Sequence, residues 1–219
     1  RKGYGPFLPE VLHTHYAYCY RCPVNREPAT CAVQCLDLLT QGYFHHSVDP
    51  EEVAAVIVEP VQGEGGFIPP HRDFLPKIQE LCRRHGIMLV ADEVQSGMGR
   101  TGRMFAFEHY GIEPDMIVLA KGIASGMPIS AVIARDDVMR WNDGGHGSTF
   151  GGNPLSCASA LATLRLLQDG LIDNAAKPEV TEAVREADWK ALHAMLRELA
   201  RQRVALEARE ADYLVEADD

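Results

Sequence analysis

The sequence predicts an α/β fold built around a mostly parallel β-sheet. Apolar runs of five or six residues recur between residues 53 and 134, and a stretch of helical periodicity separates the first run from the second. Each of the first three runs ends at an ionisable residue with glycine or proline nearby. Alternation of strand and helix is typical of layered domains in which helices cover a parallel sheet.

The elements are expected in the following order. Residues 1–50 are irregular, with one short helix over Ala29–Leu39. The continuous apolar run Val53–Val58 predicts a strand that is buried on both faces. A helix is expected over Phe74–His85, because its apolar residues recur at helical spacing and Gly86 can end it. Further buried strands are expected at Ile87–Ala91, Met116–Ala120 and Ile129–Ala134.

Residues 178–219 differ in pattern from residues 1–177, which we expect to form one domain. No glycine or proline follows Pro178, and the apolar residues alternate at spacings of three and four. This spacing predicts an amphipathic helical tail with one polar position in its seam. The seam residues are Trp189, Leu192, Leu196, Leu199, Arg203 and Leu206.

The composition excludes several classes of function. The chain has 219 residues, of which 46% are hydrophobic, so a globular core is expected and global disorder is not. No apolar run reaches the roughly 18 residues of a membrane span. The formal net charge of −10 argues against binding to nucleic acid. The six cysteines of a chain this long do not by themselves indicate disulfides, so we expect free thiols in a reducing, cytoplasmic setting.

Four of the six cysteines lie close together in the sequence. Cys19, Cys22, Cys31 and Cys35 form a C-x2-C pair and a C-x3-C pair separated by eight residues. Zinc accepts four thiolates at such spacings. However, the separation is short for a zinc ribbon and the neighbouring prolines fit a packed loop, so we expect no metal site. A mixed site with the nearby histidines is the weaker alternative.

The ionisable residues at the strand ends are Glu59, Asp92 and Lys121. Ligands of open α/β sheets bind at the carboxyl ends of strands, although a charge can also mark the return of the chain to solvent. A lysine is a good nucleophile when desolvation lowers its pKa. Pyridoxal phosphate requires such a lysine, together with an acid for its pyridinium nitrogen. Three strand ends in succession favour a site of this kind.

The surroundings of these residues resemble a known family. Four motifs in order are similar to those of the class III (ω-amino-acid) aminotransferases, which are fold type I pyridoxal-phosphate enzymes, and residues 18–23 look most like the 4-aminobutyrate aminotransferase branch. The resemblance runs from about Gly3 to Lys177. The motifs are Val58–Gly66, Leu89–Gly102, Pro114–Gly126 and His146–Pro154.

The resemblance implies roles for particular residues. Lys121 would hold pyridoxal 5'-phosphate as a Schiff base and then shuttle the proton, while Asp92 would pair with the ring nitrogen. Glu59 would lie near the substrate, and Glu64 would pair with a mobile arginine. The remaining cofactor contacts implied are Val94 on a ring face, Gln95 at the ring hydroxyl, and Thr149, with Ser148 beside it, at the phosphate of the neighbouring subunit of a homodimer.

The resemblance covers only the central portion of the family's large domain. The amino-terminal segment that grips the cofactor phosphate and the carboxy-terminal small domain have no counterpart here, and residues 178–219 do not match. The function implied is transfer of an amino group from an ω-amino acid to a 2-oxo acid. The alternatives are an amino-acid racemase of the same family and a fragment that is inactive without a partner chain.

Overall fold

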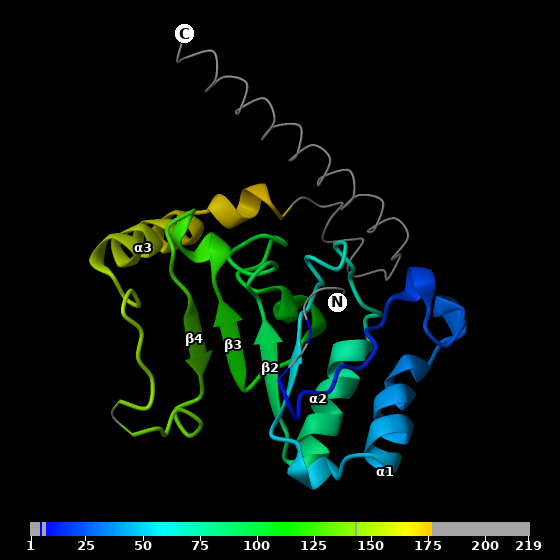
Figure 1. The fold of residues 1–219 in the computed structure, drawn as a ribbon. Coiled ribbons are helices and arrows are strands. Elements are labelled where there is room, and N and C mark those ends of the chain that lie inside the picture. The colour runs from blue at the N-terminus through cyan, green and yellow to red at the C-terminus, as the bar shows by residue number, and fades with distance from the viewer. Residues whose placement is uncertain (1–4, 6–7, 143, 177–219) are drawn as a thin grey trace.

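The computed structural model describes residues 5, 8–142 and 144–176. Its centre is a four-stranded sheet (Figure 1). The strands follow one another across the sheet in chain order, and the first three are parallel while the last is antiparallel. The prediction of an α/β fold with a mostly parallel sheet is therefore confirmed. The strands are β1 (Ala55–Val58), β2 (Met88–Asp92), β3 (Met116–Leu119) and β4 (Ala131–Ala134).

Helix α2 (Phe74–His85) connects β1 to β2 and has the predicted bounds. It ends at Gly86, whose φ of 68° lies in the left-handed region that glycine adopts readily. One face of α2 packs on the sheet and forms the main core. That core includes Phe74, Leu75, Ile78, Cys82, Leu89 and Val58, together with Ala17, Val33 and Cys35 from the amino-terminal segment.

Helix α3 (Pro154–Gln168) was not predicted. Its start nevertheless carries a recognisable signal, because Asn153 accepts the Ser156 N–H at 2.9 Å as an N-cap and Pro154 follows it. α3 packs on the turn Lys121–Ala124 that follows β3. A second core cluster forms there from Leu119, Ile123, Ala124 and Ala160.

The helix expected over Ala29–Leu39 is wrong. The segment instead contains short 3₁₀ turns at Pro28–Thr30 and Gln34–Leu36, a π-helical stretch at Leu38–Tyr43, and the short helix α1 (Phe44–His46). Val33 has a φ of 65°, and a residue in that conformation cannot continue a right-handed helix.

Burial of the first strand on both faces is also wrong. Val58 is buried against α2, but Ile57 on the opposite face is 70% exposed. β1 lies at one edge of the sheet, and within the described residues α2 covers only one of its faces. No helix of this described part is long and apolar enough to cross a membrane. The tail expected over residues 178–219 lies outside the described residues.

Candidate active site

The three parallel strands bring their terminal acids and lysine to one edge of the sheet. Glu59 directly follows β1, Asp92 is the last residue of β2, and Lys121 comes two residues after β3. β2 neighbours both β1 and β3, so Asp92 lies on the strand between the other two residues. The arrowheads of β2 and β3 point to the same edge in Figure 1. The expectation that these three residues share one edge of the sheet is therefore met, and their roles there stay a prediction.

The backbone of Lys121 adopts a strained conformation. Its φ of 44° lies in the left-handed region, which costs a non-glycine residue about 1–3 kcal/mol. Ala120 before it is fully extended, so the chain turns sharply where the strand ends. Residues in such conformations persist where the surrounding fold holds them, and they gather at functional sites.

The amine of Lys121 is paired with Glu64. Its Nζ lies 3.3 Å from Oε1 of Glu64, and the same oxygen accepts a hydrogen bond from Nε2 of Gln95. Three predicted site residues thus meet at one carboxylate oxygen. Glu64 is placed by the loop after β1, Gln95 by the loop after β2, and Lys121 by the turn after β3.

The desolvation expected for Lys121 is not found. Its side chain is 52% exposed and that of Glu64 is 85% exposed. The carboxyl edge of the sheet at Glu64 and Lys121, which we call the shelf, is therefore open to solvent rather than closed into a pocket. An ion pair this exposed adds at most about 1 kcal/mol to stability.

Two loops are locked together beside this ion pair. The Gly63 N–H donates to Oε2 of Glu59 at 2.7 Å, which fixes the turn after β1. A Cβ at Gly63 would lie 2.6 Å from Cγ of Gln95, so glycine is required for the two loops to approach this closely. Glu59 therefore shapes the loop that carries Glu64.

Asp92 has one oxygen engaged by its own loop. Its Oδ1 accepts the Val94 N–H at 3.1 Å. Among the described residues no hydrogen bond reaches Oδ2, so this oxygen can accept one from a cationic nitrogen. Val94 is only partly buried beside it, and its contact with a ligand ring stays a prediction.

Among the described residues, no hydrogen bond joins Ser148 or Thr149 to Glu64, Asp92 or Lys121. Oγ of Ser148 accepts the Gly151 N–H at 3.0 Å within its own turn, and both residues are exposed. The phosphate contact across a subunit boundary therefore stays a prediction.

Sequence reasoning missed Glu93, which is only 1% exposed. Successive strand residues point to opposite faces, so a polar pair at a strand end places one of its members inward. Oε2 of Glu93 accepts the Ser96 hydroxyl at 2.7 Å, and Oε1 accepts the Phe107 N–H at 2.8 Å. Its carbonyl also accepts the Gly97 N–H at 2.9 Å. Glu93 thus holds the loop that carries Gln95.

Burial raises the pKa of Glu93 above its ordinary value, although the hydrogen bonds from Ser96 and Phe107 oppose the shift. A raised folded-state pKa means that the folded protein binds the proton more tightly than the unfolded chain does. Glu93 therefore favours folding most at low pH, and this contribution is lost as pH rises through its folded-state pKa.

We expect Glu93→Ala to lower the free energy of unfolding by about 2–4 kcal/mol, because it leaves a cavity and an unpaired Phe107 N–H. Glu93→Gln can keep both bonds, with its oxygen toward Phe107 and its amide toward Ser96. That variant should stay close to the parent in stability and lose the acid-side pH dependence. Urea unfolding between pH 4 and pH 8 measures both effects, and a Glu93→Gln variant as unstable as Glu93→Ala would contradict this role.

Tyr16 was also missed. Its hydroxyl donates to the carbonyl oxygens of Glu59 at 3.0 Å and Pro60 at 3.2 Å. Burial raises its pKa well above the ordinary value, with Tyr110 and Glu59 adding to the shift, so it remains a donor. Tyr16 thereby ties the amino-terminal segment, which contains the cysteines, to the loop of the site.

In the part of the chain that the structure describes, no group of three histidine, cysteine or acidic residues is placed to hold a metal ion. The thiol of Cys31 donates to Oε1 of Gln34 at 3.1 Å, and that of Cys19 points to the Ala17 carbonyl at 3.8 Å. We expect the purified protein to lack stoichiometric zinc, because these thiols are engaged elsewhere. Elemental analysis tests this, and one zinc ion per chain would contradict it.

The parallel strands, with ionisable residues at their carboxyl ends, are those of an incomplete fold type I domain. This is the α/β class of the pyridoxal-phosphate-dependent transferases. The chain belongs to the family Aminotransferase class-III, which it matches over residues 1–205. This match extends beyond residue 177, so the domain boundary drawn there stays a prediction.

Curated relatives support the family and vary in activity. The 4-aminobutyrate aminotransferase of Mycobacterium leprae is 44% identical over 181 residues, which are 82% of this chain and 41% of that protein. The acetylornithine aminotransferase of Archaeoglobus fulgidus is 48% identical over 69% of this chain and 40% of its own length. The leucine/methionine racemase of Thermococcus litoralis is 39% identical over 74% and 37%.

A solved structure agrees with the fold. The (S)-enantioselective ω-transaminase of Thermomicrobium roseum superposes with a TM-score of 0.67 and 34% identity, over 77% of this chain and 38% of that one. The chain thus spans about two-fifths of the length of the proteins that it matches.

Proposed function

We propose that this chain supplies the central part of a pyridoxal-phosphate-dependent aminotransferase. The observation that carries the proposal is the arrangement of Asp92 and Lys121 at the ends of adjacent parallel strands, with Glu64 and Gln95 bound beside the lysine. The reaction proposed transfers an amino group from an ω-amino acid, of the 4-aminobutyrate type, to a 2-oxo acid. The similarity to 4-aminobutyrate aminotransferases supports this choice of donor.

The residues of the shelf fit pyridoxal phosphate. Oδ2 of Asp92 is free among the described residues to accept a hydrogen bond from the pyridinium nitrogen, and Val94 is exposed enough to pack on a ring. Gln95, now bound to Glu64, can turn its amide toward the ring hydroxyl. Lys121 is accessible for a covalent link through Nζ. Thr149 and Ser148 are proposed to serve the phosphate of a neighbouring subunit.

The cofactor, when bound, draws electrons from the bond broken at the substrate carbon. The chain itself supplies three functions. Asp92 would hold the ring nitrogen by accepting its hydrogen bond at Oδ2, while Oδ1 accepts the Val94 N–H. Lys121 receives a proton at Nζ from the substrate carbon and returns it to a different carbon. Glu64 holds the ammonium group at 3.3 Å while the lysine is charged, which keeps it over the site between the two transfers.

We further propose that the complete enzyme is a cytoplasmic homodimer. Its interface would include helix α3, which carries apolar side chains on both faces. Leu155, Leu161 and Leu166 of α3 are 66%, 55% and 58% exposed. A helix that is apolar all round belongs in an interior. We therefore expect this face to be covered in the complete enzyme, close to the turn that carries Thr149.

A racemase is the second candidate, because the Thermococcus litoralis racemase is 39% identical. The two reactions differ in their need for an acceptor. The complete enzyme should release product from 4-aminobutyrate only when a 2-oxo acid is added. Inversion of a single amino-acid enantiomer without any 2-oxo acid would establish the racemase instead.

The chain of 219 residues should by itself be a poor enzyme. The open shelf leaves a bound cofactor exposed, and phosphate contacts worth about 1.5–3 kcal/mol each are expected from segments outside it. Adding the amino-terminal part of a relative in trans should restore cofactor absorbance before it restores turnover. Unaided transamination by this chain with micromolar cofactor affinity would contradict the incomplete-site proposal.

A further inference from the structure

Four cysteines line one cavity outside the proposed active site. Cys19, Cys22, Cys31 and Cys35 line a single cavity of about 10 Å³, which His71 also lines. All four are free thiols. They come from two segments, residues 17–22 and 31–35, that the fold lays against each other. The two segments therefore bring cysteines that are up to 16 positions apart in the sequence to the wall of one small cavity.

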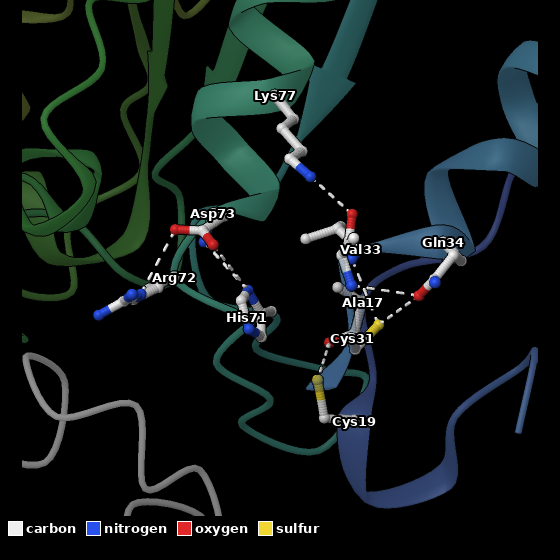
Figure 2. Close-up of polar contacts among 10 residues, drawn as sticks. Ala17, Cys19, Cys31, Val33, Gln34, His71, Arg72, Asp73 and Lys77 are labelled. Carbon is white, nitrogen blue, oxygen red and sulfur yellow. Dashed lines mark hydrogen bonds and ion pairs between the residues drawn. The ribbon is translucent and has the colours of Figure 1, made fainter. Parts of the chain in front are cut away.

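Cys31 is held at the rim of this cavity by its own turn. Its sulfur accepts the Val33 N–H at 3.3 Å and donates to Oε1 of Gln34 at 3.1 Å (Figure 2). The N–H reaches the sulfur because Val33 adopts a φ of 65°, a strained conformation for a β-branched residue. Nζ of Lys77 on α2 donates to the Ala32 carbonyl at 2.6 Å and fixes the same turn. Cys31 is partly exposed, whereas Cys35 is only 5% exposed.

Cys19, on the other segment, lines the same cavity as Cys31, and its thiol is directed to the Ala17 carbonyl (Figure 2). Among the charged neighbours that disfavour its ionisation, Cys31 acts most strongly. Burial first, and Cys31 second, raise the pKa of Cys19 to about 11, and the same two causes raise the pKa of Cys35 to about 11. Thiolates react with peroxides and thiols do not, so neither of these residues is the first to be oxidised.

We propose that Cys31 and Cys19 form a reversible disulfide when the protein reacts with a hydroperoxide. The Cys31 sulfur attacks the peroxide oxygen, the O–O bond breaks, and an alcohol or water leaves as Cys31 becomes a sulfenic acid. The Cys19 sulfur then displaces that hydroxyl group as water, with loss of its proton. Two electrons pass from the two thiols to the hydroperoxide, and a dithiol reductant returns them.

Trypsin separates the relevant cysteines. Cleavage after Lys2, Arg21, Arg26 and Arg72 places Cys19 in peptide 3–21, Cys22 in peptide 22–26, and Cys31 with Cys35 in peptide 27–72. The full chain is treated with hydrogen peroxide, its remaining thiols are alkylated, and the digest is mapped without reductant. The expected product is peptide 3–21 linked to peptide 27–72, which disappears after treatment with a dithiol.

Variants assign the bond. The link should be lost in Cys31→Ser and retained in Cys22→Ser, which removes a thiol from the same cavity and serves as the matched control. Cys82 and Cys157 lie on other peptides and should remain alkylated.

Three outcomes of the mapping would overturn the proposal. They are a link through peptide 22–26, a link that survives in Cys31→Ser, and unlinked thiols after the peroxide is fully consumed. So would one tightly bound zinc ion per chain, because the thiolates would then be metal ligands. If a variant fails to fold, fragment-ion sequencing of the linked wild-type peptides places the bond at Cys31 or at Cys35, and a bond at Cys35 overturns the proposal.

Discussion

Lys121→Ala abolishes transamination in the complete enzyme, with an expected loss on the order of 10⁴-fold or more. The substitution removes both the nucleophile that links to the cofactor and the base that moves the proton. Stability should change by at most about 1 kcal/mol, since the Glu64 ion pair that is lost is exposed. Steady-state turnover and thermal unfolding, measured on the same preparation, separate the two effects.

Two controls sharpen this experiment. Lys121→Arg keeps a cation near Glu64 but cannot form the covalent link, so it should be as inactive as the alanine variant. Lys77→Ala removes a partly buried lysine on α2 that binds the Ala32 carbonyl, and it should leave turnover unchanged. In the parent enzyme, borohydride reduction followed by peptide mapping should label Lys121. Label on Lys77 or Lys177 would show that the lysine is wrongly assigned.

Asp92→Asn should retain the cofactor and lose most of the activity. Asparagine keeps an oxygen for the Val94 N–H but cannot remain anionic opposite the ring nitrogen, so the cofactor withdraws electrons less strongly. Loss of one charge in an organised site raises the barrier by about 3–4 kcal/mol, or several hundred-fold in rate. Absorbance at constant cofactor occupancy and single-turnover rates measure the two expectations.

The control for Asp92 is Asp73→Asn. Asp73 pairs with Arg72 at the start of α2 and is 49% exposed, and among the described residues no hydrogen bond or ion pair joins it to Glu64, Asp92 or Lys121. It should leave the single-turnover rate unchanged. Near-normal transamination by Asp92→Asn would disprove the role at the ring nitrogen, whatever the outcome for Lys121.

The parts predicted from the sequence are those in which local pattern and tertiary packing agree. The bounds of α2 follow from helical periodicity together with Gly86, and both signals survive in the fold. The positions of Glu59, Asp92 and Lys121 follow because parallel strands end at a common edge. These predictions needed no knowledge of contacts between distant residues.

The parts that were missed depend on such contacts. The left-handed turn at Val33, which prevents the helix expected over Ala29–Leu39, is held by packing: Val33 is 2% exposed in the main core. The inward direction of Glu93 depends on the Phe107 N–H, fourteen residues away. The exposure of Lys121 depends on how much of the chain covers the sheet edge, which local sequence does not encode.

The open edge of β1 has a consequence for handling the protein. Residues 55–58 use one side of their backbone for β2, and in the described structure no strand pairs with the other side. Unpaired amide and carbonyl groups beside the exposed Ile57 make a template for strand addition. Two copies that meet there can extend their sheets into a common one, so we expect association to increase with protein concentration. A lysine in place of Ile57 should keep the chain dispersed without disturbing the face packed on α2.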